Sequence, residues 1–462
     1  MLIRFELENF LSFNQRQSFS MIASNLRNKS NHILKTNHIK LLKLASIYGA
    51  NASGKTNIIK GIDLFKFIVT KKVPADINDM YFREKEENKN KVTRFEVEFI
   101  KNNFIYAYGI ELSLNKGVII SEWLYKLLPD KDEEVMIYER KLDGEEYIVI
   151  FNEDIIIGED KKRLNFIISD MRMNYSTLLL SEMNRNKNIK KDSTLYFFEE
   201  VHDWFRNDLK IFFPNDHITK FDYVIGKDKS KNKVLNNIIS SFDTGISSVT
   251  LEEISKDEMG EVFPRHILEN ILNEIREHRI SDNKKILETS VLRGKDEFFQ
   301  ISNITNDNYS VETIKLRHGS DHTTYNFREE SDGTRRLFDL LDILLNADMN
   351  KVFLVDELDR SLHPNLTYKF IELFYEITLE KNIQLIFTTH ESNIMDLNLV
   401  RQDEIWFIER NDMNESILYS LDNFKERYDK RIEKAYLEGR YGAIPIFNSF
   451  KSFINSESGD EL

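Results

Sequence analysis

The residues best suited to chemistry form one glycine-rich stretch near the N-terminus, from Gly49 to Thr56. The stretch fits the G-x-x-x-x-G-K-S/T pattern of a phosphate-binding loop, in which glycines let backbone N–H groups close around phosphate oxygens. An apolar run, residues 41–48, precedes it, and a run with helical apolar spacing follows. The helix N-terminus would add a dipole that favours an anion. This setting predicts a nucleoside triphosphate site more strongly than a chance glycine turn.

The side chains of this loop have separate expected roles. Lys55 would reach the β- and γ-phosphates, and the Thr56 hydroxyl would ligate Mg²⁺. The remaining residues would surround the phosphates. The expected nucleotide-binding residues of the loop are Gly49, Ala50, Asn51, Ala52, Ser53, Gly54, Lys55, Thr56 and Asn57.

A second chemical pattern lies far along the chain, where four apolar residues end in two acids at Asp356 and Glu357. This is the Walker B pattern. A buried strand would place Asp356 at its carboxyl end, where it could share Mg²⁺ with Thr56. Glu357 would then orient or deprotonate the attacking water. Taken alone, the pattern also fits an ordinary strand followed by an acidic turn.

Two more patterns flank the acidic one. Ser331 and Gly333 stand just before a convincing buried helix, residues 337–345, so they lie at a helix N-terminus, which is an anion-binding position. An N-cap with no other role is an equally good interpretation. Downstream, an apolar strand over residues 384–388 leads to His390. A single histidine at a strand end is normally structural.

The spacing of apolar residues along the chain changes twice. Residues 2–8 and the segment 93–151 alternate apolar and polar positions, which predicts strands, including a hairpin over 93–112. From about residue 160 to 292 the pattern favours helices, and residues 195–205, 234–242 and 266–280 have amphipathic helical spacing. The last third returns to short apolar runs of the kind that fill a parallel sheet, with a helix over 366–377 between two of them. We therefore expect the two ends of the chain to share one sheet core, separated by a helical insertion.

Composition excludes several classes of function. The 462 residues are 41% hydrophobic, carry a formal net charge of −13 and include no cysteine. Disulfides, zinc–thiolate sites and thiol catalysis are therefore excluded. The acidic balance argues against a protein that coats DNA, although it leaves room for a local basic groove. Without a signal peptide or an apolar run long enough to span a bilayer, the chain is expected to be cytoplasmic and to have no membrane contact.

Together these motifs resemble an ABC/SMC-type AAA ATPase, specifically the compact family associated with bacterial abortive infection and other anti-phage systems. The match extends over both ends of the chain and leaves only the helical middle weakly determined. The family's Q-loop glutamine has no counterpart in the hairpin region, residues 93–128. The segments that carry the resemblance are Phe5–Phe13, Gly49–Thr56, Asp243–Ile246, Glu330–Thr334, Val355–Pro364, Thr388–Ser392 and Ala435–Pro445.

The resemblance implies an α/β fold: a P-loop ATPase head, with a mixed sheet core and an antiparallel β-subdomain, interrupted by a helical insertion. Its expected parts are residues 1–155 with the phosphate loop, 156–295 as the insertion, and 296–462 with the remaining motifs. It also implies that Ser331 and Gly333 belong to the signature motif, that Asp359 in the D-loop contacts nucleotide, and that His390 is the switch histidine. Glu357, His390 and Lys55 would be the catalytic residues.

The function implied by the resemblance is an ATP- and Mg²⁺-dependent switch in anti-phage defence. Ser331 and Gly333 of one subunit would close over ATP bound at Lys55 of the other, giving a dimer or a higher oligomer. A partner effector, a nuclease or toxin, would deliver the damage, and a nucleic acid or a phage protein would be the trigger.

Three other functions share parts of this pattern. A DNA-repair or chromosome-maintenance ATPase that binds DNA directly has the same motifs, but the acidic charge and the lack of a long coiled coil lower its standing. A nuclease with an ATPase head would need a Toprim domain after the head, and too few residues follow His390 for one. A small-molecule kinase would not need the signature and switch elements.

Overall fold

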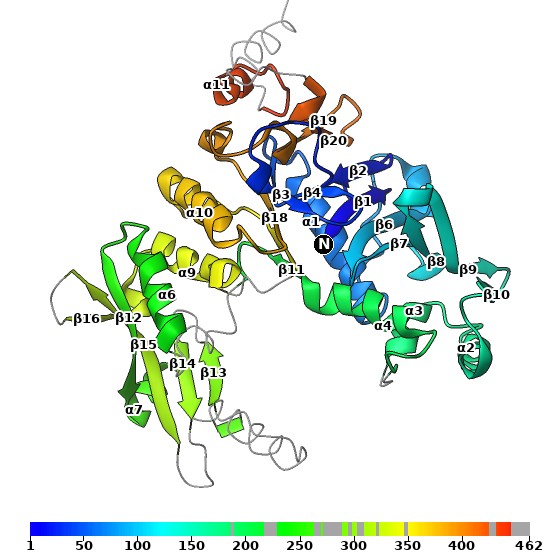
Figure 1. Ribbon diagram of the computed structural model, residues 1–462, viewed down its shortest axis with the longest axis horizontal. Helices are drawn as coiled ribbons and strands as arrows, with labels where there is room; N and C mark the ends of the chain where they lie inside the picture. The colour runs from blue at the N-terminus through cyan, green and yellow to red at the C-terminus, as the bar shows by residue number, and fades with distance from the viewer. Residues whose placement is uncertain are drawn as a thin grey trace, which may run out of the picture. The chain divides into compact units, whose positions relative to one another are not determined.

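The computed structural model describes residues 1–185, 189–216, 229–262, 269–270, 289–293, 298–302, 309–319, 323–345, 350–424 and 431–444. The chain divides into two compact units. The first unit comprises residues 1–214, 348–358 and 375–462, and the second comprises 215–347 and 359–374. Figure 1 labels their helices and strands.

A seven-stranded antiparallel sheet forms one part of the first unit, in the order β10-β9-β8-β7-β6-β1-β2 (Figure 1). Buried and partly exposed side chains alternate along β6, because one face of the sheet lies on the core. The predicted hairpin and the antiparallel strands that follow it are confirmed. The strands are β1 (Leu2–Glu8), β2 (Gln17–Ser20), β6 (Thr93–Lys101), β7 (Phe104–Ser113), β8 (Val118–Leu128), β9 (Glu133–Asp143) and β10 (Glu146–Phe151).

The second sheet of this unit has the order β11-β17-β18-β5-β19-β20. All its neighbours are parallel except the β19–β20 pair. Strands β5 and β18 are buried along their whole length, as parallel strands covered on both faces should be. The two ends of the chain thus share this sheet, as the sequence predicts. The strands are β5 (Leu44–Tyr48), β11 (Leu209–Phe212), β17 (Lys351–Val355), β18 (Ile383–Thr388), β19 (Ile405–Arg410) and β20 (Ser416–Ser420).

The apolar run of residues 41–48 is not one strand. It divides into β4 (Lys40–Leu42) and β5, and β4 pairs with β3 (Ile33–Lys35). Lys43 lies at the break because its ammonium donates to the carbonyl oxygens of Thr378 and Leu379. These carbonyls follow the C-terminus of α10 (Pro364–Ile377), where a lysine is a favourable hydrogen-bond donor.

Helix α1 (Lys55–Thr70) packs against the antiparallel sheet. The Phe65 ring stacks on Phe95 and Tyr108 at centroid distances of 5.8 and 5.7 Å. Gln384 of β18 joins the two sheets: its side-chain oxygen accepts from the Leu2 backbone N–H at 2.6 Å, and its amide donates to the carbonyls of Leu2 and Leu42. Because α1 begins in the phosphate loop, the packing of both sheets fixes the position of that loop.

Three helices that the sequence assigned to the insertion belong to the first unit. They are α2 (Gly158–Asp170), α3 (Leu179–Asn184) and α4 (Tyr196–Asp203). The buried Glu122 of β8 accepts from the first N–H groups of α3, at Leu179 and Leu180, and from the hydroxyls of Tyr108 and Tyr138. Burial and the Glu122 charge raise the pKa of both tyrosines well above the usual value, so their hydroxyls stay protonated donors.

The second unit holds a five-stranded sheet, in the order β12-β15-β14-β13, with β16 also paired to β15. The helical insertion predicted over 156–295 is not helical throughout, because β11, β12 and β13 lie within this range together with α2, α3, α4, α6 and α7. Residues Ile246–Ile254 are rich in β-branched side chains, which favour a strand over a helix. The strands are β12 (Ile246–Ile254), β13 (Thr289–Arg293), β14 (Phe298–Ser302), β15 (Ser310–His318) and β16 (Thr324–Asn326).

Among the residues that the structure describes, the other α-helices are α6 (Lys229–Ser240), α7 (Lys256–Val262), α9 (Asp332–Leu345) and α11 (Ile432–Leu437). The helices predicted over 195–205, 234–242, 337–345 and 366–377 are confirmed as α4, α6, α9 and α10. A helix predicted over 266–280 lies outside the described residues apart from 269–270, as does the end of the 435–445 segment. Within the described ranges, no helix is both long and apolar enough to cross a membrane.

The first prediction concerns the link between the two sheets. Replacing Gln384 by Leu leaves two carbonyls and one N–H without their partner in a buried position. The free energy of unfolding should therefore fall by about 2–4 kcal/mol. Urea unfolding followed by circular dichroism measures this. Gln17→Leu is the matched control, because the half-buried Gln17 accepts a single backbone bond, from Leu418. Equal stabilities for Gln384→Leu and the unmodified chain would contradict the role given to Gln384.

Candidate functional site: a phosphate loop and its carboxylates

The phosphate loop follows β5 and leads directly into α1. Gly54 has φ of 114° and Ala52 has φ of 62°, so the backbone turns through the left-handed region where glycine is favoured. A Cβ on Gly49 would collide with the carbonyl of Ile408, and one on Gly54 would collide with the hydroxyl of Ser416. Close packing therefore requires both glycines of the predicted motif, and Gly54 is favoured by its backbone conformation as well.

Two serines that the sequence did not single out fix this loop from outside. The Ser416 hydroxyl of β20 donates to the carbonyl of Ser53 at 2.5 Å and lies 2.7 Å from the Ser12 hydroxyl. The backbone N–H of Ser416 also donates to the carbonyl of Ser12, and Asn57 donates to the Ser12 hydroxyl. Ser12 lies inside a segment that carries the family resemblance, whereas no sequence pattern points to Ser416.

The loop has the form of an anion cradle. The buried Lys55 ammonium donates to the carbonyl oxygens of Gly49 and Ala50 at 2.8 and 3.2 Å, so it lies against the loop that it is expected to serve. The Ser53 hydroxyl is buried and has no hydrogen-bond partner among the described residues. A cationic side chain and an unsatisfied hydroxyl beside a helix N-terminus fit a bound phosphate group.

The two predicted metal ligands lie together. Asp356 directly follows β17, and its carboxylate accepts from the Thr56 hydroxyl at 3.3 Å. Only 2% of Asp356 is exposed. In the sheet, β18 separates β17 from β5, so the phosphate loop and the acidic strand are not neighbours. A hydroxyl and a carboxylate at the carboxyl edge of a parallel sheet are suitable ligands for Mg²⁺.

Thr388, at the end of the intervening strand β18, connects the site and was missed in the sequence. Its hydroxyl donates to Asp356 at 2.6 Å and accepts from the backbone N–H of Glu357 at 2.8 Å. Its carbonyl accepts from the N–H of Leu358 at 3.0 Å. Thr388 is fully buried, so these bonds are shielded from water. The sequence signals were its place two residues before His390 and its position in the Thr388–Ser392 segment that carries the family resemblance.

Glu357 and His390 stand where the sequence predicts them, at the ends of β17 and β18. Glu357 has φ of 48°, which is unfavourable for a residue with a Cβ and typical of strain retained at functional sites. Its backbone is held by Thr388, and its side chain is partly exposed. His390 is exposed. A partly exposed acid beside the expected metal ligand is suited to contacting a water molecule.

The signature and D-loop residues belong to the second unit. The Ser331 hydroxyl accepts from the backbone N–H of Thr334 at 3.1 Å and so caps α9, as predicted. A Cβ on Gly333 would come within 2.7 Å of the Ser361 carbonyl, which makes glycine necessary there. Asp359 is partly exposed, and its carbonyl accepts from Leu362 N–H. Contact of these residues with nucleotide stays a prediction.

A family model described as "AAA domain, putative AbiEii toxin, Type IV TA system" matches residues 44–172 and 174–396, which is most of the chain. The chain belongs to this AAA-domain family. The matched residues include the phosphate loop, the acidic strand β17 and the strand β18, which ends at Thr388. Family membership makes the chain a P-loop ATPase-type protein, and such proteins bind ATP together with Mg²⁺. None of the curated proteins matches the sequence.

Three solved structures of SMC heads are similar to the chain at 14% identity each. An SMC head bound to the C-winged helix domain of ScpA has a TM-score of 0.41, covering 92% of this chain and 99% of the other. The SMC head from Thermotoga maritima has 0.39, covering 91% and 98%. The Pyrococcus furiosus SMC head with an extended coiled coil, bound to the C-terminal domain of ScpA, has 0.38, covering 95% and 99%. The α/β head with its antiparallel subdomain is established by this chain's own strand order and register.

The second prediction isolates Thr388. In Thr388→Val the size of the side chain is kept but its hydroxyl is lost, so Asp356 loses its donor and the N–H of Glu357 loses its acceptor. The gain in nucleotide affinity on adding Mg²⁺ should then be about 10-fold smaller, because removing groups that orient metal ligands weakens metal binding by about this factor. Titration of a fluorescent ATP analogue at varied Mg²⁺ measures this. Thr388→Ser keeps the hydroxyl and should behave like the unmodified chain; a serine variant as impaired as the valine variant would contradict this role.

Proposed function

We propose that this chain is an ATP-hydrolysing switch whose nucleotide state controls pairing of two subunits and, through it, a toxic partner in anti-phage defence. The observation that carries the proposal is the chain of contacts from Thr56 through Asp356 and Thr388 to Glu357. It connects the phosphate loop, the expected metal ligand and the expected base across three strands. A structural role alone would not require a strained, partly exposed glutamate at this point.

The residues of the first unit have distinct parts in this proposal. Lys55 and the loop N–H groups bind the phosphates, because they supply positive charge at a helix N-terminus. Thr56 and Asp356 hold Mg²⁺, which supplies neutralisation of the charge that develops on the phosphate oxygens. Glu357 orients or deprotonates the attacking water, and His390 contacts the γ-phosphate. Thr388 keeps Asp356 and Glu357 in fixed relative positions.

Pairing depends on the second unit in this proposal. Ser331, Gly333 and Asp359 of one subunit contact ATP held by the other, which gives a nucleotide sandwich in a dimer or a higher oligomer. The Ser331 side chain is exposed at the N-terminus of the 14-residue helix α9, which supports this role because such a terminus attracts anions. ATP binding would then be read out as a change in subunit pairing.

The defence role is supported by the family, whose description names a toxin of a toxin–antitoxin system. We infer that the chain controls a separate effector, a nuclease or toxin, and responds to a nucleic acid or a phage protein. The acids that the motifs identify are committed to nucleotide and Mg²⁺, so the isolated chain should hydrolyse ATP slowly and leave DNA intact.

The third prediction tests the role of Glu357. Glu357→Gln keeps the backbone held by Thr388 and leaves Asp356 to bind Mg²⁺, but removes the group that activates water. ATP hydrolysis should fall by about 100-fold or more, and sedimentation with ATP should show a larger species than with ADP. Glu376→Gln, an exposed change on α10, is the control and should leave both measurements unchanged. Normal hydrolysis by Glu357→Gln would remove Glu357 from the mechanism.

The fourth prediction tests the nucleotide sandwich. Lys55→Ala should abolish nucleotide binding, whereas Ser331→Arg should retain it and block turnover. In a mixed dimer of the two inactive chains, one interface combines an intact Lys55 with an intact Ser331, so ATP hydrolysis should return in part. Subunit exchange is verified by labelled chains. If no ATP hydrolysis returns although the subunits exchange, the proposed nucleotide sandwich is contradicted. Catalysis would then take place within one chain or would require two intact sites.

A further inference from the structure

The outer face of the seven-stranded sheet, opposite the face that packs on α1, carries an assembled surface that the nucleotide chemistry does not use. One row of cross-strand neighbours runs over five strands, because directly paired residues project from the same face. We call this row and the hollow beside it the outer face. The row consists of Ile150, Glu139, Trp123, Gly109 and Glu96.

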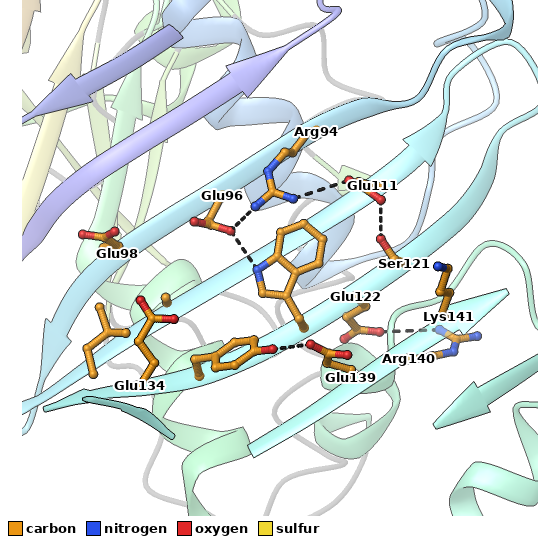
Figure 2. A pocket seen from close by; sticks show the side chains of 14 residues that line it. Arg94, Glu96, Glu98, Glu111, Ser121, Glu122, Glu134, Glu139, Arg140 and Lys141 are labelled. Carbon is orange, nitrogen blue, oxygen red and sulfur yellow. Dashed lines mark hydrogen bonds and ion pairs between the residues drawn. The ribbon is translucent and has the colours of Figure 1, made fainter. Parts of the chain in front are cut away.

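A tryptophan forms the floor of the outer face. Gly109 leaves room for the Trp123 indole to lie across β7, since a Cβ at position 109 would collide with the ring. Figure 2 shows Arg94, Glu96 and the other charged side chains that line the hollow. The indole N–H donates to Glu96 at 2.8 Å, and the Arg94 guanidinium lies 4.2 Å from the ring centroid. Glycine inside a strand and a tryptophan fixed on a solvent-facing sheet indicate a shaped surface rather than random exposure. The hollow above it has a volume of about 420 Å³.

The outer face has an excess of negative charge. Two cations, Arg94 and Lys141, line the hollow together with more carboxylates than they can neutralise, whereas Glu122 and Arg140 pair with each other in the core. Burial and neighbouring glutamates raise the pKa of Glu98, although Arg4 lies 3.3 Å away. Burial and nearby glutamates also raise the pKa of Tyr125 to about 12. The carboxylates of the hollow are Glu96, Glu98, Glu111, Glu134 and Glu139.

An apolar margin adjoins the acidic hollow. Ile148 and Ile150 of the edge strand β10 are 53% and 57% exposed, and they pair with Lys141 and Glu139 of β9. Their side chains therefore lie on the same face as Trp123. Two exposed isoleucines on an edge strand are a liability for aggregation unless a partner covers them.

We propose that the outer face binds an extended basic segment of a partner protein, one in which the side chains that face the sheet include both Lys or Arg and apolar residues. The carboxylates attract and orient the cations, and the isoleucines and Trp123 accept the apolar side chains. From β10 to β6 the row spans roughly 19 Å, which about six extended residues can cover. The excess of carboxylates repels nucleic acid, and a small polyamine would leave the isoleucines exposed.

The test uses a labelled peptide of about nine residues, the Arg–Val peptide, in which every second residue is alternately Arg or Val and the residues between them are Ser. Arg and Val then project from the same side of the extended peptide. A Glu–Val peptide of the same design serves for comparison. Fluorescence anisotropy should show that the chain binds the Arg–Val peptide and does not bind the Glu–Val peptide. Binding of the Arg–Val peptide should also change the tryptophan fluorescence of the chain. The change can be assigned to Trp123, because the other two tryptophans, Trp204 and Trp406, are buried. Glu134→Lys combined with Glu139→Lys should weaken binding at least about 10-fold. Ile148→Ser combined with Ile150→Ser should weaken the Arg–Val peptide more than an Arg–Ser peptide.

The matched control is Glu376→Lys combined with Glu380→Lys, which makes the same change in net charge at exposed positions on α10 and just after it. Binding within about twofold of the unmodified chain supports a local site. Equal weakening by the control pair would show general attraction to an acidic protein and overturn the proposal. Displacement of the Arg–Val peptide by spermine at the same concentration of positive charge would identify a site for small cations and overturn the proposal. Failure of the unmodified chain to bind the Arg–Val peptide would overturn it as well.

Discussion

The hydrogen bond from Thr388 to Asp356 is the contact on which the rest of the nucleotide site depends. The two residues end adjacent parallel strands, β18 and β17, and the same threonine hydroxyl accepts from the backbone of Glu357. Asp356 is almost completely buried, so its carboxylate needs donors in the absence of a metal. One hydroxyl thus positions the expected metal ligand and holds the next residue in a left-handed conformation that would otherwise be unfavourable.

The strand order imposes a second constraint on this site. Because β18 lies between β5 and β17, the phosphate loop and the acidic strand come from sequence segments that must fold together. The Gln384 bonds to Leu2 and Leu42 and the Ser416 bonds to Ser12 and Ser53 join the N-terminal and C-terminal parts at two further places. The second unit comprises residues 215–347 and 359–374, so the chain leaves the first unit and returns to it twice.

The sequence predicted the features that depend on local pattern. The phosphate loop, the acidic strand and the antiparallel hairpins follow from glycine spacing, apolar runs and period-two alternation. It could not predict Thr388, Ser12 or Ser416, because a single hydroxyl carries no pattern and acquires its role from tertiary contacts. The helical expectation for about 160–292 failed at residues 246–254, where β-branched side chains favour a strand although the burial of side chains does not alternate regularly. The outer face was also missed, because its row joins residues from five strands and becomes visible only through their register.

The most direct test of this account is calorimetric titration of the chain with a non-hydrolysable ATP analogue, with and without Mg²⁺, and with Asp356→Ala as the variant. The account predicts one analogue bound per chain, with affinity at least about 10-fold higher in Mg²⁺. In Asp356→Ala that gain should disappear while Mg²⁺-independent binding remains. Binding of equal strength with and without Mg²⁺, or an undiminished Mg²⁺ effect in the variant, would contradict the site as assembled from Lys55, Thr56, Asp356 and Thr388.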